Sequence, residues 1–325
     1  MGAVAHRVLL DVDTGVDDAL AVLFAVAHPD IELVGITCVA GNTSLENVVA
    51  NTLTVLDIAG APELPVAAGA LRPLIEPPRA SHVHGTDGLG DLGLPVSTRV
   101  PDARHAVDLA RDLLLASDHP VTIVALAPQT NLALLLRLHP EVAPKIERIL
   151  FMGGSASGGN ATAVAEFNVW HDPEAAAVVL SSGVPAFMYG LDVFNQVTID
   201  EPAARALLAS SSASERLAGA LLHFQMADPE SDDATDPAAF GGHIGDAGAL
   251  CALVDPDALR VERHPVRVEL GGESRGQTVV DRRRRVGEDT VHAGGGSAAH
   301  PIDVALDVDV ERFARLFLET ISRLP

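Results

Sequence analysis

The sequence has few aromatic residues, few basic residues and only two cysteines. Aromatic side chains make up 3% of the 325 residues, so a core has to be built from Ala, Val, Leu and Ile; hydrophobic residues, at 48%, are sufficient for one. Lys145 is the only lysine, and the formal net charge is -22. A field of this sign repels phosphate, which argues against a nucleic-acid-binding protein and favours cations or neutral small molecules as ligands.

Other absences bound the environment of the protein. Cys38 and Cys251 both lie in apolar segments, which predicts two buried free thiols and neither a disulfide framework nor a zinc site. No apolar run reaches the ~20 residues that a transmembrane helix needs, and the first residues lack the pattern of a signal peptide. We therefore expect a cytoplasmic protein that does not bind membranes.

Strand-like and helix-like segments alternate along the first part of the chain. Short apolar runs predict strands at residues 8–12, 33–39, 121–126, 146–152 and 186–189, and amphipathic runs predict helices at 17–27, 45–58, 131–138 and 172–181. Ser44 is suited to cap the second helix, and Pro173 to begin the last. This alternation predicts right-handed βαβ crossovers and a mostly parallel, Rossmann-like central sheet flanked by helices.

The C-terminal part has a different character. Segments 261–270 and 277–280 read as a small hairpin around Gly271 and Gly272, followed by a strand at 302–308 and a closing helix at 310–321. Segments 153–165, 228–237 and 282–300 read as long loops. Without an internal repeat or a clear linker, we expect one α/β domain over residues 1–325.

Four carboxylates follow the first predicted strand. Asp11 and Asp13 share one face of that strand, and Asp17 and Asp18 lie in the first turn of the next helix. One or two acidic residues here could simply complement the positive end of the helix dipole, but four are more than that role needs. Four carboxylates in a partly buried site would repel one another at a cost of several kcal/mol. Because oxygen ligands suit hard cations, the cluster predicts a Ca²⁺ or Mg²⁺ site at the carboxyl end of the strand.

The acidic cluster and further segments resemble the nucleoside hydrolase family. Residues 11–21 read DVDTGVDDALA, similar to the family's DxDPGxDDAxA with Thr14 in place of Pro. Further similar segments occur in the family's order over essentially the whole chain: VAGNT at 39–43, HGTDGLG at 84–90, APQTNLA at 127–133, AEFNVWHDPEAA at 165–176, GDAGAL at 245–250 and RGQTVVD at 275–281. The run at 165–176 is the most specific of them.

The resemblance implies an enzyme that uses Ca²⁺ to hydrolyse the N-glycosidic bond of ribonucleosides. The cation would be bound by the side chains of Asp13, Asp18 and Asp246 and by the backbone carbonyl of Thr130. Asp13 would also be the general base that takes a proton from water held by the cation, with Asn42 orienting Asp13 or the water. Nearby carboxylates would stabilise the oxocarbenium-like transition state.

The resemblance also implies a binding site for the ribose. The residues assigned to the substrate are Asp17, Asn160, Glu166, Phe167 and Asn168. Amide and carboxylate groups suit this role, because sugar hydroxyls need both donors and acceptors. Each assignment has an ordinary alternative: Asn160 as a turn residue, Glu166 and Asn168 as surface residues around a buried Phe167, and Asp246 as a helix cap.

The group that assists the leaving base is not fixed by the sequence. One branch of the family is thought to use a histidine directly before the late metal-binding aspartate, where this chain has Gly245. His243 could take that role, with an ordinary loop histidine as the alternative, and His84 could instead contact the base. Trp170 does not lie where a stacking residue is expected, and Phe224 or Phe240 could stack on the base. The base preference therefore stays open.

Three other functions compete with a nucleosidase. A dehalogenase-like phosphatase would use Asp11 as nucleophile and Asp13 as acid, but it needs a downstream lysine, for which only Lys145 is present. A hydrolase of another N-riboside, and a nucleoside- or ribose-binding homologue without catalysis, would both keep the same metal site. By resemblance, the protein is expected to be a homodimer or homotetramer.

Overall fold

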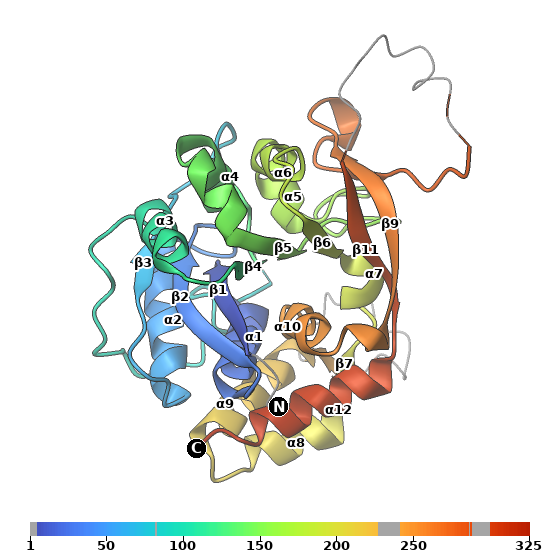
Figure 1. The fold of residues 1–325 in the computed structure, drawn as a ribbon. Helices are drawn as coiled ribbons and strands as arrows, with labels where there is room; N and C mark the ends of the chain where they lie inside the picture. Colours follow the sequence, from blue (N-terminus) through green and yellow to red (C-terminus); the bar gives the residue numbers. More distant parts are fainter. Residues whose placement is uncertain (1–4, 82, 227–240, 286, 288–299) are drawn as a thin grey trace.

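The computed structural model describes residues 5–81, 83–226, 241–285, 287 and 300–325, and a nine-stranded sheet crosses its centre (Figure 1). The strand order is β10-β9-β11-β6-β5-β4-β1-β2-β3. The strands are β1 (His6–Val12), β2 (Ile31–Cys38), β3 (Val66–Ala68), β4 (Val121–Ala125), β5 (Ile146–Met152), β6 (Ala186–Tyr189), β9 (Leu259–Val268), β10 (Thr278–Val280) and β11 (Pro301–Val308). β7 (Thr198–Asp200) and β8 (Gly241–His243) form a separate antiparallel pair.

The predicted fold class is confirmed. Every pairing from β3 through β2, β1, β4, β5 and β6 to β11 is parallel, and the pairings of β9 with β11 and with β10 are antiparallel. β9 and β10 are the predicted C-terminal hairpin, which extends one edge of the sheet. β1 and β4, in the middle, are almost entirely buried, as expected for parallel strands covered on both faces.

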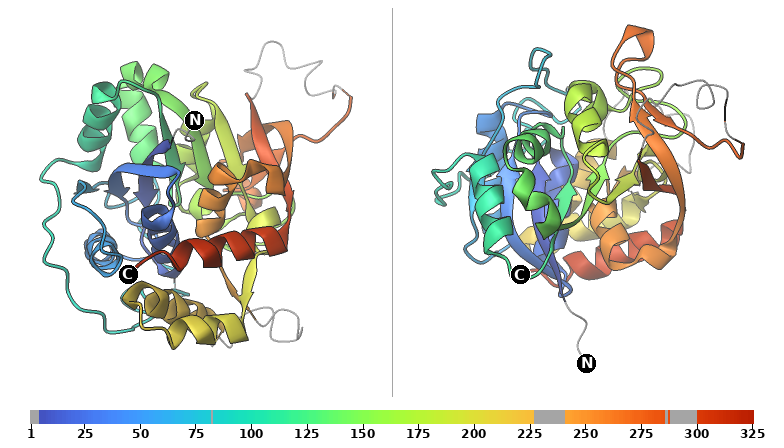
Figure 2. Two further views of the ribbon diagram at one scale, coloured as in Figure 1. Left: turned by 60° about the horizontal axis from the view of Figure 1, so that its bottom comes forward. Right: turned by 45° about the horizontal axis from the view of Figure 1, so that its top comes forward.

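Helices cover both faces of the sheet. The larger ones are α1 (Val16–Ala27), α2 (Leu45–Ile58), α3 (Ala106–Ala116), α4 (Thr130–Leu138), α6 (Pro173–Leu180), α8 (Glu201–Leu208), α9 (Ala213–Met226), α10 (Ala247–Val254) and α12 (Val310–Ile321), and the short ones are α5 (Phe167–His171) and α7 (Leu191–Phe194). Figures 1 and 2 show α3, α4 and α6 on one face of the sheet and α1, α2, α10 and α12 on the other.

Two hydrophobic cores result from the alternation of side chains along the strands. Leu10 and Val12 of β1 point to the face of α1, α10 and α12, where Phe24 and Phe317 stack at 6.5 Å between ring centroids. Leu9 points to the opposite face, which α3, α4 and α6 cover. The cores are built mainly from aliphatic side chains, as the composition predicts, and burying them supplies most of the stability of the domain.

Local sequence signals locate several elements closely. α2 and α12 have the predicted bounds, and the Ser44 hydroxyl caps α2 by accepting a hydrogen bond from Asn47 N at 3.3 Å. Cys38 and Cys251 are buried free thiols, as predicted. Segment 153–165 is a loop; segment 228–237 and most of 282–300 lie outside the described residues. The helices α3, α8 and α9 and the β7–β8 pair were not predicted. In the described part of the chain, no helix combines the length and apolar character needed to cross a bilayer.

Candidate active site

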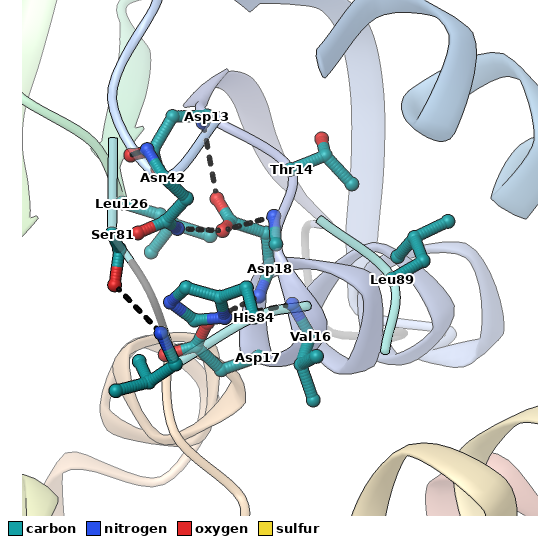
Figure 3. A network of polar contacts seen from close by, with 12 residues as sticks. Asp13, Thr14, Val16, Asp17, Asp18, Asn42, Ser81, His84, Leu89 and Leu126 are labelled. Carbon is teal, nitrogen blue, oxygen red and sulfur yellow. Dashed lines mark hydrogen bonds and ion pairs between the residues drawn. The ribbon is translucent and has the colours of Figure 1, made fainter. Parts of the chain in front are cut away.

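The candidate site lies where the strand order reverses. β1 and β4 are neighbours in the sheet, and the connection after β1 leads to β2 on one side whereas the connection after β4 leads to β5 on the other. Such a switch point opens a crevice above the carboxyl ends of the strands. The turn from β1 to α1, the segment after β2 and Leu126 after β4 all meet there (Figure 3).

Asp18 organises the turn between β1 and α1. Its carboxylate accepts hydrogen bonds from Gly15 N at 2.9 Å, from Asp13 N at 3.2 Å and from Asn42 Nδ2 at 3.1 Å (Figure 3). The bond to Gly15 N closes the first turn of α1, whose N-terminal dipole also favours a negative charge there. Asp18 is therefore fixed in one orientation by backbone and side-chain donors.

Asp13 lies beside Asp18 and is completely buried. Its Oδ2 accepts a hydrogen bond from Asn42 N at 2.7 Å, whereas Oδ1 is buried with no hydrogen-bond partner among the described residues. Asn42 thus contacts both carboxylates, through its backbone to Asp13 and its side chain to Asp18. Asn42 is therefore placed to orient Asp13, one of the two roles considered for it.

Asp246 comes to the same place from the distant part of the chain. It occupies the N-cap position of α10, but its side chain makes no capping hydrogen bond, so the ordinary capping role does not apply. One carboxylate oxygen each from Asp17, Asp18 and Asp246 lies within 4.8 Å of the others. Asp246 Oδ1 is buried and, among the described residues, has no hydrogen-bond partner. We call Asp13, Asp17, Asp18 and Asp246 the carboxylate floor.

Burial and mutual repulsion raise the pKa of these carboxyl groups. Loss of hydration, followed by the charge of Asp17, raises the pKa of Asp18 to about 7. Burial and then Asp18 raise the pKa of Asp13 well above its usual range, and burial and then Asp17 do the same for the pKa of Asp246. No Lys or Arg of the described residues forms an ion pair with any of the four. The negative charge is therefore not balanced by a Lys or Arg of the described residues, although His84 Nδ1 lies 3.8 Å from Asp17 Oδ1.

This arrangement fits a hard divalent cation. All available donors are oxygens, which Ca²⁺ and Mg²⁺ prefer, and two of them are buried without a proton donor among the described residues. A cation also removes the repulsion that raises the pKa values of the carboxyl groups. The residues present thus match the group that the resemblance implies, with Asp17 within the close cluster in addition to the predicted Asp18 and Asp246.

Asp11 has a different role from the other acids of the motif. Its Oδ1 accepts hydrogen bonds from Thr37 Oγ1 at 2.7 Å and from Asn131 Nδ2 at 2.8 Å, which tie β1 to β2 and α4. Asp11 is buried within the sheet and does not line the cavity. Lys145, at the opposite end of β5, donates to Ser117 O at 3.0 Å. The structure thus gives no support to the phosphatase hypothesis, which needs both residues at one site.

A cavity of about 450 Å³ opens above the carboxylate floor. Its lining contains most of the predicted site residues: Asp17, Asn42, His84, Asn160, Glu166, Phe167, Asn168, His243 and Asp246. Asp13 and Asp18 lie beneath the lining, in contact with Asn42. The volume suits a small organic molecule of nucleoside size.

The segment predicted to be most specific forms one side of the cavity. Glu166 caps α5 and accepts hydrogen bonds from Gly154 N at 2.8 Å, Asn168 N at 2.8 Å and Val169 N at 3.1 Å. Burial raises the pKa of Glu166 to about 7 in spite of these bonds. Glu166 and Asn168 are buried whereas Phe167 is partly exposed, so the alternative of surface residues around a buried Phe167 is wrong.

Aromatic rings form another side of the cavity. The ring centroids of Phe167 and Trp170, both on α5, lie 6.1 Å apart. Phe194 of α7 stacks on His243 of β8 with 6.4 Å between ring centroids. All four line the cavity and are partly exposed; we call them the aromatic wall. Phe224 instead contacts Gly90, and Phe240 lies outside the described residues. The predicted site residues Phe167 and His243 are therefore joined at the cavity by Trp170 and Phe194, which were not predicted to contact the base.

Two expected positions need correction or explanation. Thr130 is not at the cavity: its hydroxyl donates to Asp172 Oδ2 at 2.6 Å in the first turn of α4, and it is Leu126, directly after β4, that lines the cavity. Leu126 is apolar, so the sequence carried no signal for it. Gly245 has φ +55°, and a Cβ there would lie 2.4 Å from the Cβ of Asp17. The backbone thus excludes a histidine at position 245 as the chain is folded.

Comparisons with known proteins agree with this geometry. The sequence profile of the inosine-uridine preferring nucleoside hydrolases matches residues 8–315. An inosine-uridine preferring nucleoside hydrolase of Leishmania major is 34% identical over 98% of each chain. A pyrimidine-specific ribonucleoside hydrolase of Salmonella agona is 39% identical over 85% of this chain and 89% of the relative. A solved plant nucleoside hydrolase, 30% identical, superposes with a TM-score of 0.88 over 97% of this chain and 98% of its own. The chain belongs to the nucleoside hydrolase family.

Proposed function

We propose that the protein is a Ca²⁺-dependent hydrolase of ribonucleosides that releases ribose and the free base. The observation that carries this proposal is the carboxylate floor, where Asp13 and Asp246 each have a buried oxygen without a hydrogen-bond partner among the described residues. A cavity of nucleoside size lies directly above it. Hydrolysis of the N-glycosidic bond is the activity for which the family is named.

The proposed cation ligands are the side chains of Asp13, Asp18 and Asp246. Ca²⁺ bound there would supply a site for the sugar hydroxyls and for the attacking water, and would make that water more acidic. Asp18 is held by three donors, so it adds charge without having to move. Thr130 does not line the cavity, whereas Leu126 does, so Thr130 is not among the proposed ligands.

Asp13 is the proposed general base. Asn42 N holds its Oδ2, and its Oδ1 is left to accept a proton from the attacking water. The water oxygen bonds to C1′ as the bond from C1′ to the base nitrogen breaks, and the electron pair of that bond leaves with the base. Positive charge develops on the ribose ring, where the carboxylates of Asp17, Glu166 and Asp246 stabilise it.

The ribose hydroxyls are proposed to bind Asp17, Asn160, Glu166 and Asn168. Asn160 uses its Oδ1 to accept from Phe167 N at 2.9 Å, which leaves its amide NH₂ to donate to a hydroxyl. Asn168 uses its Nδ2 to donate to Leu126 O at 2.9 Å, which leaves its oxygen to accept. The pair therefore offers one donor and one acceptor, as a sugar with vicinal hydroxyls requires. Phe167 is proposed to contact the sugar or base from the aromatic wall.

Two histidines are candidates for the acid that assists the leaving base. His243 stacks on Phe194 in the aromatic wall, where an aromatic base would bind. His84 accepts a hydrogen bond from Val16 N at 3.2 Å and lies 3.8 Å from Asp17 Oδ1, beside the carboxylate floor. The position of His243 suits proton donation to the base, and that of His84 suits support of Asp17 and of the start of α1.

The test is release of ribose from inosine, adenosine, guanosine, uridine and cytidine, with Ca²⁺ and with a chelator. We expect release with Ca²⁺, loss with chelator, and a reduction on the order of 10²–10⁴-fold in Asp13→Ala. Binding of nucleosides without ribose release would favour a non-catalytic binding protein. Release of ribose only from a different N-riboside, such as nicotinamide riboside, would favour a hydrolase of that N-riboside.

The assembly of the protein is a prediction of the family resemblance, and its location is a prediction of the sequence pattern. We expect a homodimer or homotetramer, which sedimentation equilibrium of the purified protein would show directly. A cytoplasmic location is expected as well, and fractionation of the source cells checks it.

A further inference from the structure

One basic side chain lines an otherwise acidic cavity. Arg79 is the only Lys or Arg in the cavity lining formed by the described residues. Its guanidinium carbon lies 4.2 Å from the centroid of the Trp170 ring, a stacked cation–π contact within the aromatic wall. Arg79 is partly exposed, so a ligand in the cavity can reach it.

Arg79 is held in place by an ion-pair network outside the cavity. Its Nη2 lies 2.6 Å from Glu76 Oε2, and Glu76 Oε1 lies 3.0 Å from Arg275 of the C-terminal hairpin region. Arg275 also pairs with Glu174 of α6 at 2.8 Å. These contacts fix the segment that carries Arg79 against α6 and the hairpin, so the guanidinium is positioned before a ligand binds.

The same segment is joined to the carboxylate floor. Ser81 N donates to Asn42 O at 3.1 Å, and Leu74 N donates to Asp172 Oδ2 at 2.9 Å. Arg79 lies between these two attachment points in the sequence. The segment that carries Arg79 is therefore bonded to Asn42, which in turn contacts Asp13 and Asp18.

Arg79 retains hydrogen-bonding capacity toward the cavity. A guanidinium has five N–H donors, and within the described ranges of the chain Glu76 is the only residue to which Arg79 donates. The cavity carboxylates of Asp17, Glu166 and Asp246 form no ion pair with it in those ranges. Arg79 is thus not placed to neutralise the acids of the site, and it offers donors to whatever occupies the aromatic wall.

We propose that Arg79 is a specificity-determining residue that donates a hydrogen bond to a ring carbonyl of the leaving base. The inference rests on the proposed hydrolase function and adds to it. When the bond from C1′ to the base nitrogen breaks, the electron pair stays on the base, whose negative charge spreads to its carbonyl oxygen. A guanidinium at that oxygen stabilises the departing anion and stays protonated, and the base then takes up a proton from solvent or from the acid of the site.

The charge distribution of the cavity matches that of the reaction. The carboxylates gather where the ribose becomes positive, and the arginine stacks in the aromatic wall where the base becomes negative. The substrate class that follows is ribonucleosides whose base carries a ring carbonyl conjugated with the leaving nitrogen. Inosine and uridine meet this requirement, whereas adenosine has no carbonyl.

The test compares Arg79→Gln with the unaltered protein on inosine, adenosine and para-nitrophenyl riboside. Nitrophenolate leaves readily without assistance, so its riboside reports the ribose and cation site alone. We expect Arg79→Gln to lower kcat/KM for inosine by about 10- to 100-fold, the effect of one charged hydrogen bond. Hydrolysis of adenosine and of the nitrophenyl riboside should fall by a smaller factor, because neither leaving group presents a ring carbonyl to Arg79, so the preference for inosine over adenosine falls.

Arg275→Gln is the matched control. It removes a guanidinium from the same ion-pair network, at the same Glu76, without removing a residue of the cavity lining. It should leave the inosine-to-adenosine ratio unchanged. An equal loss on all three substrates in Arg79→Gln, or the same change of ratio in Arg275→Gln, would show that Arg79 only positions its segment, and would overturn the inference. If the unaltered protein hydrolyses none of the substrates, it is the proposed function that fails.

Discussion

The floor and the aromatic wall of the cavity are built in different ways. Asp13 and Asp18 of the floor are fully buried and fixed by backbone N–H groups and Asn42. The rings of the wall are partly exposed, come from α5, α7 and β8, and are held mostly by one another. The floor is therefore fixed in one geometry, as the proposed cation and ribose site requires, whereas the rings of the wall have room to adjust to the proposed base.

The largest expected effect comes from removing a charge from the floor. Asp246→Asn should abolish Ca²⁺-dependent ribose release, by at least about a thousandfold or about 4 kcal/mol of transition-state stabilisation. In chelator the same variant should unfold at higher temperature than the unaltered protein, because it removes a buried charge next to Asp17 and Asp18. Asp118→Asn, at an exposed carboxylate, is the control and should change neither property. A lower melting temperature in Asp246→Asn would mean that Asp246 is a structural residue.

A smaller effect is expected in the aromatic wall. His243→Gln should lower kcat for uridine by about 100-fold if its proton reaches the leaving base, and should leave para-nitrophenyl riboside unaffected. His84→Gln should reduce hydrolysis of both substrates alike, because His84 contacts Val16 and Asp17 at the floor. Interchanged results would assign the acid to His84 and confine His243 to stacking.

Gly245 follows His243 of the aromatic wall by two residues and packs against Asp17 of the carboxylate floor, so a substitution there tests how the two regions are joined. Gly245→Ala should destabilise the chelated protein by about 1–3 kcal/mol more than Gly93→Ala, since both glycines have positive φ but only at Gly245 would a Cβ collide, with Asp17. Urea unfolding measures the difference. Equal losses would indicate that the chain near Gly245 shifts freely, and would reopen this position to a histidine.

The last expected effect is a dependence of stability on pH that has opposite sign at His171, beside the aromatic wall, and at Asp18, in the carboxylate floor. Burial lowers the pKa of His171, which packs on Phe167, from 6.5 to about 4. The unfolded chain therefore binds the proton first, and the folded protein should lose about 3 kcal/mol as pH falls from about 6.5 to about 4. Asp18, with its pKa raised to about 7, should cost the cation-free protein stability as pH rises from about 4 to about 7.

His171→Leu separates the two contributions. It should remove the loss of stability as the pH falls from about 6.5 to about 4. The opposite loss, as the pH rises from about 4 to about 7, should remain, and added Ca²⁺ should reduce it. Urea unfolding in chelator across this pH range provides the measurement. If His171→Leu still loses as much stability as the pH falls from about 6.5 to about 4, other groups are responsible for that loss.

The difference between floor and wall also explains what could be predicted from the sequence. Three of the four floor residues, Asp13, Asp17 and Asp18, follow closely on one buried strand, so period and spacing are sufficient to locate them. The central strands and the helices α2 and α12 are predictable for the same reason, since their signals are local. Asp246 and the run at 165–176 follow from the family resemblance.

What the sequence did not show depends on contacts between distant segments. Trp170, Phe194 and Arg79 become cavity residues only because α5, α7 and the segment before residue 82 meet in space. Leu126 reaches the cavity through its place after β4, which its apolar side chain does not reveal, and the steric limit at Gly245 arises from Asp17 more than 200 residues away in the sequence. Hydrophobic periodicity is a local signal and carries no information about contacts between distant segments.

The most direct test of the metal assignment measures cation binding and catalysis in the same samples. Protein stripped with chelator is titrated with Ca²⁺ by calorimetry, and ribose release from inosine is recorded at each point. We predict one Ca²⁺ per chain, with activity rising in parallel with occupancy, and the loss of both in Asp246→Asn. Full activity in protein that binds no cation, or Ca²⁺ binding that Asp246→Asn leaves unchanged, would contradict the assignment of the carboxylate floor as the catalytic metal site.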